Sequence, residues 1–469
     1  MKYLFVDLDK SLIKSDYLFE SFINYFSKNI FAPIIAIYLL ISQGKVGLKK
    51  FLHEKSRISE ENLPYNKSVI TYIKNWKAKY DGRVYLISAS DSRFVEKVAN
   101  HLKVFHGSYG TNKINLRSKN KLEKINSISK GVGFEYIGDS FDDLVIWKDA
   151  KKIISVNPSK SLLKKIESLN GVKEEIIERD NFLKKILKSI RLHQWVKNTL
   201  LFIPFILAGA FSFNSISTLL LGFIAFSLVA SAFYILNDFF DIESDRIHPT
   251  KFKRPFAEGS VSIPSGIMIF ICLLLGAAVI SKNLPYLFQI CLSIYAFSTF
   301  TYSKYIKKIA VLDIFTLTFL YVFRVISGGV LVEVPVSNWL LTFSVFFFLF
   351  LAAVKRWIEI KSFDKSNIQG RGYVSSDQNF VAQLSYFSGL ISALIVCLYI
   401  DSQQAQNLYS STPVLWLIPI ILLFWIIETL FKVERGKVED DPVLYALKSK
   451  TSYFALVCFG VIIYLATIL

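Results

Sequence analysis

The sequence predicts a chain of two parts, an α/β domain with a parallel sheet and an all-α domain that crosses the membrane. In residues 1–160, short apolar runs typical of strands alternate with polar, helix-like stretches, as in parallel sheets covered on both faces. After residue 198, long apolar runs follow one another to the last residue. The composition agrees, because 52% of the 469 residues are hydrophobic, more than soluble domains usually carry.

Charge and cysteine content narrow the class of protein. The chain carries 55 Lys and Arg against 37 Asp and Glu, a net charge of +18. A basic domain joined to membrane spans favours anionic lipid headgroups or phosphates over nucleic acid as partners. The four cysteines lie far apart in apolar runs, which indicates neither a metal site nor a disulfide framework. The N-terminus lacks the pattern of a signal peptide, so we expect residues 1–190 in the cytoplasm.

Polar side chains follow three expected strands at the point where each strand ends. The strands are residues 3–6, 83–87 and 134–137, and they end at Asp7, Ser88 and Gly138 respectively. The carboxyl ends of parallel strands meet at one edge of a sheet, where the sites of such domains lie. We therefore expect a single polar site at this edge.

The stretch between the first two strands, about residues 15–65, is expected to form a helical cap. Its almost wholly apolar run, residues 30–41, is shorter than the ~20 residues that a spanning helix needs. A buried helix of the cap is the favoured interpretation, and a helix that lies on the membrane surface is the alternative.

The residues at the sheet edge suit phosphoryl transfer. Two carboxylates two positions apart, Asp7 and Asp9, can divide the work of nucleophile and proton carrier. Ser88 can donate to phosphate oxygens, and Lys121 can neutralise charge on the transferring group. Carboxylates after the third strand, such as Asp139, suit Mg²⁺, which prefers oxygen ligands.

In this order the motifs resemble those of the haloacid dehalogenase-like (HAD) phosphohydrolases over about residues 1–160. The resemblance implies Asp7 as the nucleophile and Asp9 as the general acid and base, and both near the metal. It implies Ser88 and Lys121 as phosphate binders, and it implies Asp139 and Asp143 as ligands of Mg²⁺.

Several positions leave alternatives open within this resemblance. Lys10 and Ser11 stand where glycine and threonine are common, and Asp142 competes with Asp143. Lys119 and Lys124 compete with Lys121, which is favoured because residues 115–121 look like an Asn-Leu-x-Gly-x-x-Lys pattern. An inactive HAD domain kept for docking is a further alternative.

The apolar pattern of residues 191–469 predicts a polytopic membrane domain. Residues 161–190, which precede it, are expected to form a basic helical connector. Nine apolar runs are candidate spans, near residues 198–213, 215–236, 265–281, 285–301, 311–331, 338–354, 380–400, 413–431 and 452–469. The loops at 237–264, 302–310, 355–379 and 432–451 are rich in Lys and Arg, whereas the loops of the other side carry only Lys282. The positive-inside rule places the charged loops, like the first domain, on the cytoplasmic side of the plasma membrane.

Three aspartates at the end of the second run form the clearest motif of this domain. Asp238, Asp241 and Asp245 share one helical face, and such a face at the membrane edge calls for a counterion. The Mg²⁺ of a magnesium-bound diphosphate supplies one. Lys251 and Arg254, which follow, can hold phosphate oxygens.

This segment resembles the NDxxDxxxD signature of UbiA-type intramembrane prenyltransferases, which adds Asn237 and Arg246 to the expected substrate contacts. In the aromatic prenyltransferases the second loop has paired aspartates, but here Leu317 stands four residues after Asp313. The second loop instead looks like that of decaprenyl-phosphate phosphoribosyltransferase, and so do residues 191–198, 435–436 and 440–442. That branch implies further substrate contacts by Lys197, Tyr302, Lys307, Asp313 and Arg324. Arg324 is favoured independently, because a charge in the middle of a span is costly without a role.

Together the resemblances predict a bifunctional, Mg²⁺-dependent membrane enzyme. The membrane domain would transfer 5-phosphoribosyl from phosphoribosyl diphosphate to a polyprenyl phosphate, and the HAD domain would remove the 5-phosphate to leave polyprenyl-phosphoryl-ribose. One alternative is prenyl transfer to an aromatic quinone precursor, against which the missing second aspartate argues. The other is a lipid-binding membrane protein with a degenerate HAD docking domain.

Overall fold

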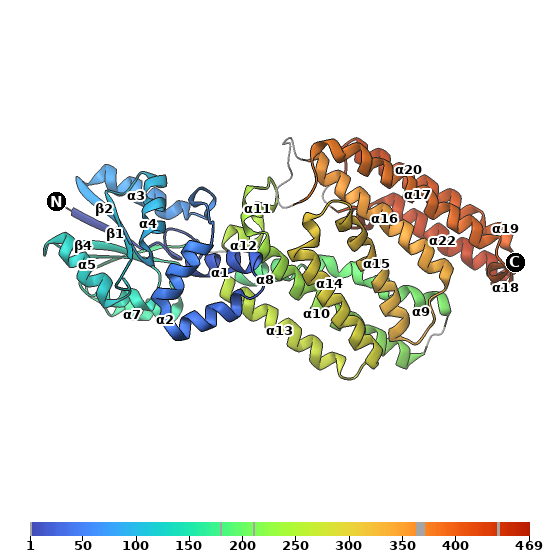
Figure 1. Ribbon diagram of the computed structural model, residues 1–469, viewed down its shortest axis with the longest axis horizontal. Coiled ribbons are helices and arrows are strands. Elements are labelled where there is room, and N and C mark those ends of the chain that lie inside the picture. The colour runs from blue at the N-terminus through green and yellow to red at the C-terminus, as the bar shows by residue number, and fades with distance from the viewer. Residues whose placement is uncertain (1, 179–180, 210–211, 363–370, 439–440) are drawn as a thin grey trace. The chain divides into compact units, whose positions relative to one another are not determined.

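The computed structural model describes residues 2–178, 181–209, 212–362, 371–438 and 441–469 (Figure 1). The chain divides into two compact units, Met1–Ile190 with Asp238–Ile269 and Arg191–Asn237 with Phe270–Leu469. The sequence predicts domains at 1–160 and 191–469 with a connector between them, whereas the first stretch of the N-terminal unit runs to Ile190. The structure adds a feature that the sequence does not predict, because the segment that carries the three aspartates groups with the N-terminal unit.

The N-terminal unit is built on a sheet of six parallel strands in the order β3-β2-β1-β4-β5-β6. The strands are β1 (Lys2–Val6), β2 (Gly82–Asp91), β3 (Gly107–Thr111), β4 (Phe134–Gly138), β5 (Lys152–Val156) and β6 (Val172–Ile176). Because Val6 pairs with both Leu86 and Ile137, the carboxyl ends of β1, β2 and β4 lie side by side. The three predicted strands and their common edge are confirmed.

Side chains of the central strand alternate between two cores, as the 2-residue period of a strand requires. Leu4 and Val6 pack with α3 (Lys67–Lys79) and α4 (Ser92–Leu102) on one face. Phe5 packs on the other face with α5 (Lys119–Ser129), α6 (Leu144–Trp147) and α7 (Lys160–Glu167). The predicted parallel sheet with helices on both faces is thus confirmed (Figure 1).

The stretch expected as a helical connector, residues 161–190, differs from the expectation. Helix α7 packs on one face of the sheet, and β6 pairs with β5 as a strand of the sheet. Only α8 (Phe182–Ile190) is a helix that follows the sheet. The cause is composition, because β6 is an edge strand with the sequence Val-Lys-Glu-Glu-Ile. Charged side chains protect an edge strand from pairing with other chains, but they hide its strand pattern.

The expected cap is present as α1 (Tyr17–Lys28), α2 (Ala32–Lys55) and the 3₁₀ turn η1 (Glu60–Asn62). Ala32 and Leu39 are buried, and Leu39 packs against α1. Most of the apolar run at 30–41 is nevertheless exposed, so the expectation of a buried helix is wrong for one side of α2. In the same unit, α11 (Ile242–Ile247), η4 (Lys251–Lys253) and α12 (Pro255–Glu258) follow the aspartate helix.

The remaining helices belong wholly or largely to the second unit. They are η3 (Leu192–Phe202), α9 (Ile203–Ala208), α10 (Phe213–Phe240), α13 (Ile263–Ser281), α14 (Tyr286–Lys304), η5 (Ile306–Lys308), α15 (Leu312–Leu331), α16 (Asn338–Lys361), η6 (Ser375–Asp377), α17 (Gln378–Ile400), α18 (Gln403–Leu408), α19 (Thr412–Leu415), α20 (Leu417–Glu434), α21 (Pro442–Lys448) and α22 (Lys450–Ile468).

Among the described residues, seven helices are long and apolar enough to cross a membrane, against nine expected runs. The run at 285–301 forms α14, whose polar residues, among them Gln289 and Ser293, lower its hydropathy. The run at 198–213 is divided between η3 and the short α9. Pro204 stands in the first turn of α9, where its missing N–H cannot continue the preceding turns.

Close approach of backbones at Gly328 generates a prediction for this unit. A Cβ on Gly328 of α15 would lie 2.2 Å from the carbonyl oxygen of Leu201, which is backbone and cannot turn aside. We expect Gly328→Ala to destabilise the protein by about 1–3 kcal/mol. Gly460→Ala in α22 is the matched control, since nothing lies within 4 Å of its Cβ. Thermal unfolding in detergent checks both, and equal midpoints for the two variants would contradict the packing described.

Candidate active sites

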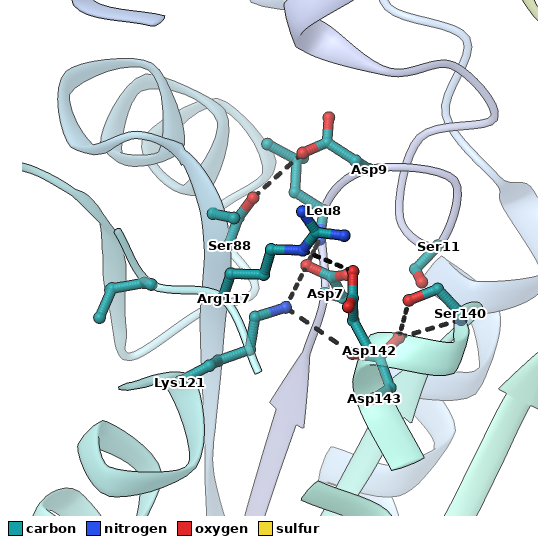
Figure 2. A network of polar contacts seen from close by, with 12 residues as sticks. Asp7, Leu8, Asp9, Ser11, Ser88, Arg117, Lys121, Ser140, Asp142 and Asp143 are labelled. Atoms are coloured by element: carbon teal, nitrogen blue, oxygen red, sulfur yellow. Dashed lines mark hydrogen bonds and ion pairs between the residues drawn. The ribbon is translucent and has the colours of Figure 1, made fainter. Parts of the chain in front are cut away.

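The carboxyl edge of the sheet gathers three carboxylates, and Figure 2 shows two of them, Asp7 and Asp143. Asp7 follows β1, and its N–H donates to the carbonyl of Ile137 at 3.0 Å, which fixes it beside β4. Asp139 and Asp143 follow β4. One oxygen from each of Asp7, Asp139 and Asp143 lies within 4.8 Å of the others. Such a set of hard oxygen ligands fits Mg²⁺.

Lys121 is the cation of this cluster. Its Nζ is buried, 3.0 Å from Asp7 Oδ1 and 3.8 Å from Asp143 Oδ1. It also donates to the hydroxyl of Tyr136 at 3.0 Å, and this hydroxyl donates to Asp143 at 2.7 Å. The competing lysines lie elsewhere, because Lys119 is exposed and Lys124 lies over the ring of Tyr109.

Burial dominates the electrostatics of the cluster. Removal from water raises the pKa of Asp7 to about 7, against the attraction of Lys121 and with the repulsion of Asp143 and Asp9. Burial likewise raises the pKa of Asp139 well above its ordinary value, and Asp143 and Asp7 add to the rise. Asp7 and Asp139 therefore hold their protons more strongly than ordinary carboxyl groups do, and a bound divalent cation would displace these protons.

Asp9, also expected near the metal, lies outside the group of three carboxylates found among the described residues. Its Oδ1 accepts from the backbone N–H of Tyr17 at 2.8 Å, at the start of the cap helix α1. Its Oδ2 accepts from the hydroxyls of Ser90 at 2.6 Å and Ser88 at 3.2 Å. Ser88 thus holds Asp9 here, and Asp9 stands at the join between the sheet and the cap.

The structure also separates the two adjacent aspartates after β4. Asp143 is buried and accepts from the backbone N–H of Ser140 at 3.0 Å and from its hydroxyl at 2.9 Å. Asp142 is only partly buried and pairs with Arg117 at 2.7 Å (Figure 2).

Sequence reasoning missed two members of this site. Ser90 lies two positions after Ser88, on a strand that continues further than predicted, so the period of a strand could have found it. Tyr136 carried no such signal, because a tyrosine inside a strand is ordinarily a core residue.

A second acidic group lies at the end of α10, where Asp238 and Asp245 are both buried. Arg254 Nη1 lies 3.2 Å from Asp238 Oδ1 and 2.7 Å from Asp245 Oδ2, so the arginine bridges the two. Burial raises the pKa of Asp245 to about 6, against the attraction of Arg254 and with the repulsion of Asp238 and Asp241. Asp241 and Lys251 are partly exposed nearby in the chain.

Arg246, expected as a phosphate binder, is occupied by the protein itself. Its two terminal nitrogens donate to the two carboxylate oxygens of Glu20 on α1, at 3.0 and 2.6 Å. Its Nε donates to the carbonyl of Ala257 at 3.0 Å. Arg246 therefore connects the cap helix α1 to the aspartate segment. Removing one partner of a buried ion pair of this kind costs about 3–5 kcal/mol of stability.

The second unit holds the other predicted substrate contacts. Arg324 is buried and donates to Asn198 at 2.9 Å, to the hydroxyl of Tyr295 at 2.7 Å and to the carbonyl of Leu320 at 2.5 Å. The charged side chain of Arg324 within α15 is thus hydrogen-bonded to polar groups of two other helices and of α15 itself. Lys307 donates to Asn237 at 3.1 Å.

Two other predicted contacts belong to buried ion networks. Asp313 lies 2.5 Å from Arg356 and accepts from the hydroxyl of Tyr373 at 2.5 Å. Lys197 lies 2.5 Å from Asp441, which caps α21. Burial raises the pKa of Asp441, but Lys197 and then Lys355 outweigh it and hold that pKa well below its ordinary value.

Two remaining positions complete the placement. The hydroxyl of Tyr302 accepts from Arg371 at 3.3 Å. Asp440, named in the sequence motif, lies outside the described residues.

Comparisons with known proteins bear on both units. Residues 199–369 match the model of the UbiA prenyltransferase family. An uncharacterised protein of Sinorhizobium fredii, y4nM, is 32% identical over 462 residues, which cover 96% of this chain and 88% of the relative. Decaprenyl-phosphate phosphoribosyltransferase of Mycolicibacterium smegmatis is 30% identical over 285 residues, which cover 58% of this chain and 88% of that enzyme. Phosphoserine phosphatase in its apo form aligns in structure with 40% of this chain and 98% of its own, at 17% identity and a TM-score of 0.29.

The matched residues, 199–369, include much of the second unit and the aspartate segment of the first. Seven helices among the described residues are long and apolar enough to cross a membrane, which agrees with a multi-pass membrane protein. The chain belongs to the UbiA prenyltransferase family.

Proposed function

We propose that this protein makes polyprenyl-phosphoryl-ribose in two steps. The first transfers 5-phosphoribosyl from phosphoribosyl diphosphate to a polyprenyl phosphate, and the second removes the 5-phosphate. The observation that carries the proposal is one chain that combines similarity to decaprenyl-phosphate phosphoribosyltransferase over 88% of that enzyme with a phosphatase-like cluster around Asp7.

In the transfer step, a phosphate oxygen of the lipid forms a bond to the anomeric carbon of ribose as the bond to the diphosphate breaks. Asp238, Asp241 and Asp245 are the proposed holders of Mg²⁺ with the diphosphate. When bound, the ion would stabilise the charge of the leaving diphosphate. Arg254, which bridges two of the aspartates, is placed to pair with phosphate oxygens instead when a substrate brings its own negative charge.

In the second step, a carboxylate oxygen of Asp7 attacks the phosphorus of the 5-phosphate and the bond to the ribose oxygen breaks. Asp9 donates a proton to that oxygen, and it then takes one from the water that hydrolyses the aspartyl-phosphate. Lys121 lies against Asp7 and would neutralise the transferring group. Asp139 and Asp143 would hold Mg²⁺, which screens the charge between phosphate and nucleophile.

The order of the steps follows from their chemistry. The product of the first step is a phosphomonoester, which is the class of substrate that a phosphatase cleaves. Placing both sets of residues on the cytoplasmic side, as the positively charged loops indicate, would let one lipid meet both sites.

A radiolabel assay tests the proposal. Detergent-solubilised protein receives Mg²⁺, polyprenyl phosphate and ribose-labelled phosphoribosyl diphosphate. We expect the wild type to give labelled lipid without a 5-phosphate. We expect Asp7→Asn to accumulate the 5-phosphorylated lipid, with dephosphorylation at least about 10³-fold slower, because the nucleophile is gone. Asp142→Asn is the matched control and should resemble the wild type, since Asp142 pairs with Arg117 and lies outside the group formed by Asp7, Asp139 and Asp143.

A dephosphorylated product in the Asp7→Asn variant would contradict the role of the N-terminal domain. Labelled lipid in none of the proteins would remove phosphoribosyl diphosphate as the donor. Prenylation of an aromatic acid should then be measured.

The transferase aspartates give a separate prediction. We expect Asp238→Ala to abolish labelled lipid of either kind, because Asp238 is a proposed holder of the diphosphate. The same variant should still hydrolyse a 5-phosphorylated lipid supplied to it, which thin-layer chromatography measures. Loss of both activities would indicate a structural effect of Asp238 and not a role in transfer.

The raised pKa of Asp7 predicts how Mg²⁺ stabilisation depends on pH. A carboxyl whose pKa is higher in the folded protein than in the unfolded chain stabilises the fold when protonated, and this contribution is lost as the pH rises through about 7. Mg²⁺ competes with these protons, so it should raise the unfolding midpoint more at pH 8 than at pH 5.5.

Thermal scans with and without MgCl₂ measure this effect. The Asp7→Asn, Asp143→Asn double variant controls for ions bound by the aspartates at 238–245. MgCl₂ should raise the unfolding midpoint of the wild type more than that of this variant, and the excess should be larger at pH 8 than at pH 5.5. An equal excess at both pH values would count against a metal site at Asp7.

A further inference from the structure

One side of helix α2 is apolar and exposed. Along its first half and the turn before it, apolar side chains recur at helical spacing and are between 43% and 81% exposed: Ile30, Phe31, Ile34, Ile37, Tyr38, Leu40 and Ile41. The opposite side of the same half is also apolar, since Ile35, Ala36 and Leu39 pack against α1. A cap helix that faced only water would carry a polar outer face, so this face is built for an apolar environment.

The second half of α2 has a different character. Gly44, at φ +66°, interrupts the helix and separates the two halves. Exposed basic residues follow it: Lys45, Lys50 and Lys55. An apolar stretch followed by exposed lysines suits a membrane surface, because the apolar side chains can enter the interface while the lysines meet anionic headgroups.

The same helix reaches the phosphatase site. Lys49 Nζ donates to the carbonyl of Ala89 at 2.5 Å, between Ser88 and Ser90, which hold Asp9. Tyr17 and His53, at the two ends of the cap, are joined by a 2.7 Å hydrogen bond. The second half of α2 is therefore held against the edge of the sheet that carries Asp7, and the exposed apolar half precedes it across Gly44.

We propose that the first half of α2 is a membrane-contacting helix, which lies in the bilayer interface and brings the phosphatase site to a phosphomonoester borne by a lipid. This deepens the proposed function, because it assigns the phosphatase a membrane-anchored substrate class. A bilayer is favoured over a protein partner because the apolar half is followed by basic residues, and because seven helices of the same chain can cross that bilayer.

The direct test measures the depth of single sites in the full chain. The protein is reconstituted in nanodiscs of phosphatidylethanolamine and phosphatidylglycerol. The four free cysteines, Cys272, Cys291, Cys397 and Cys458, are replaced by alanine. A spin label is attached at position 37 or 41, or, as a matched control, at Val132. Val132 is an exposed apolar residue just before β4, at the amino-terminal edge of the sheet.

We expect labels at 37 and 41 to be relaxed more by oxygen than by a water-soluble nickel complex, and the label at 132 to show the reverse. Aqueous behaviour at all three positions would overturn the proposal. Dipolar broadening between labels of two molecules at 37, together with aqueous accessibility, would also overturn it in favour of contact between copies.

An activity measurement separates this inference from the proposed function. The Ile37→Lys, Ile41→Lys variant should cleave the lipid that accumulates with Asp7→Asn roughly tenfold more slowly, because two apolar anchors are lost. Hydrolysis of soluble p-nitrophenyl phosphate should be unchanged. Equal loss on both substrates, or on neither, would contradict membrane docking. If no labelled lipid forms at all, the proposed function fails, while the depth measurement still decides whether α2 contacts the bilayer.

Discussion

Pairing of buried charges is the constraint on which both units depend. A charge out of water is tolerated only when a partner neutralises it or when hydrogen bonds replace its hydration. Lys121 lies between Asp7 and Asp143, and Arg246 is held by Glu20. In the second unit Arg356 pairs with Asp313 and Lys197 with Asp441. Each pair joins elements far apart in the sequence, so the charges that suggest chemistry also fix the fold.

The two carboxylate clusters, around Asp7 and at the end of α10, differ from the simple pairs because several carboxylates lie together in each. Around Asp7, three carboxylates face a single lysine, and at the end of α10 a single arginine bridges two buried aspartates. Repulsion between neighbouring carboxylates raises the pKa values of Asp7 and Asp245, on top of burial. An ion pair that is already balanced gains little from a further cation, whereas these two clusters gain neutralisation from it. The close grouping of Asp7, Asp139 and Asp143 distinguishes this candidate metal site from the structural ion pairs.

The sequence predicts features that depend on neighbouring residues better than contacts between residues far apart in the chain. The strand-end motifs predicted the common edge of β1, β2 and β4, because parallel strands bring their ends together without any knowledge of side-chain packing. Partner choice could not be predicted in this way. Nothing near Arg246 indicates Glu20, and nothing near Asp313 indicates Arg356, since both partners come from distant segments. The edge strand β6 was missed because its charges resemble a polar helix.

The sequence also could not predict which side of the apolar run in the cap is buried. Residues 30–41 are equally apolar all round, so the sequence alone gives no reason to expect one face in the core and another exposed. Packing decides it, because α1 covers Leu39 and its neighbours and leaves Ile34, Ile37 and Ile41 uncovered. Burial of that face in a bilayer would be favourable by about 25 cal/mol of free energy for each Å² of apolar surface removed from water. A phosphatase whose cap rests in the interface samples its lipid substrate in two dimensions, and its site need only recognise the phosphate.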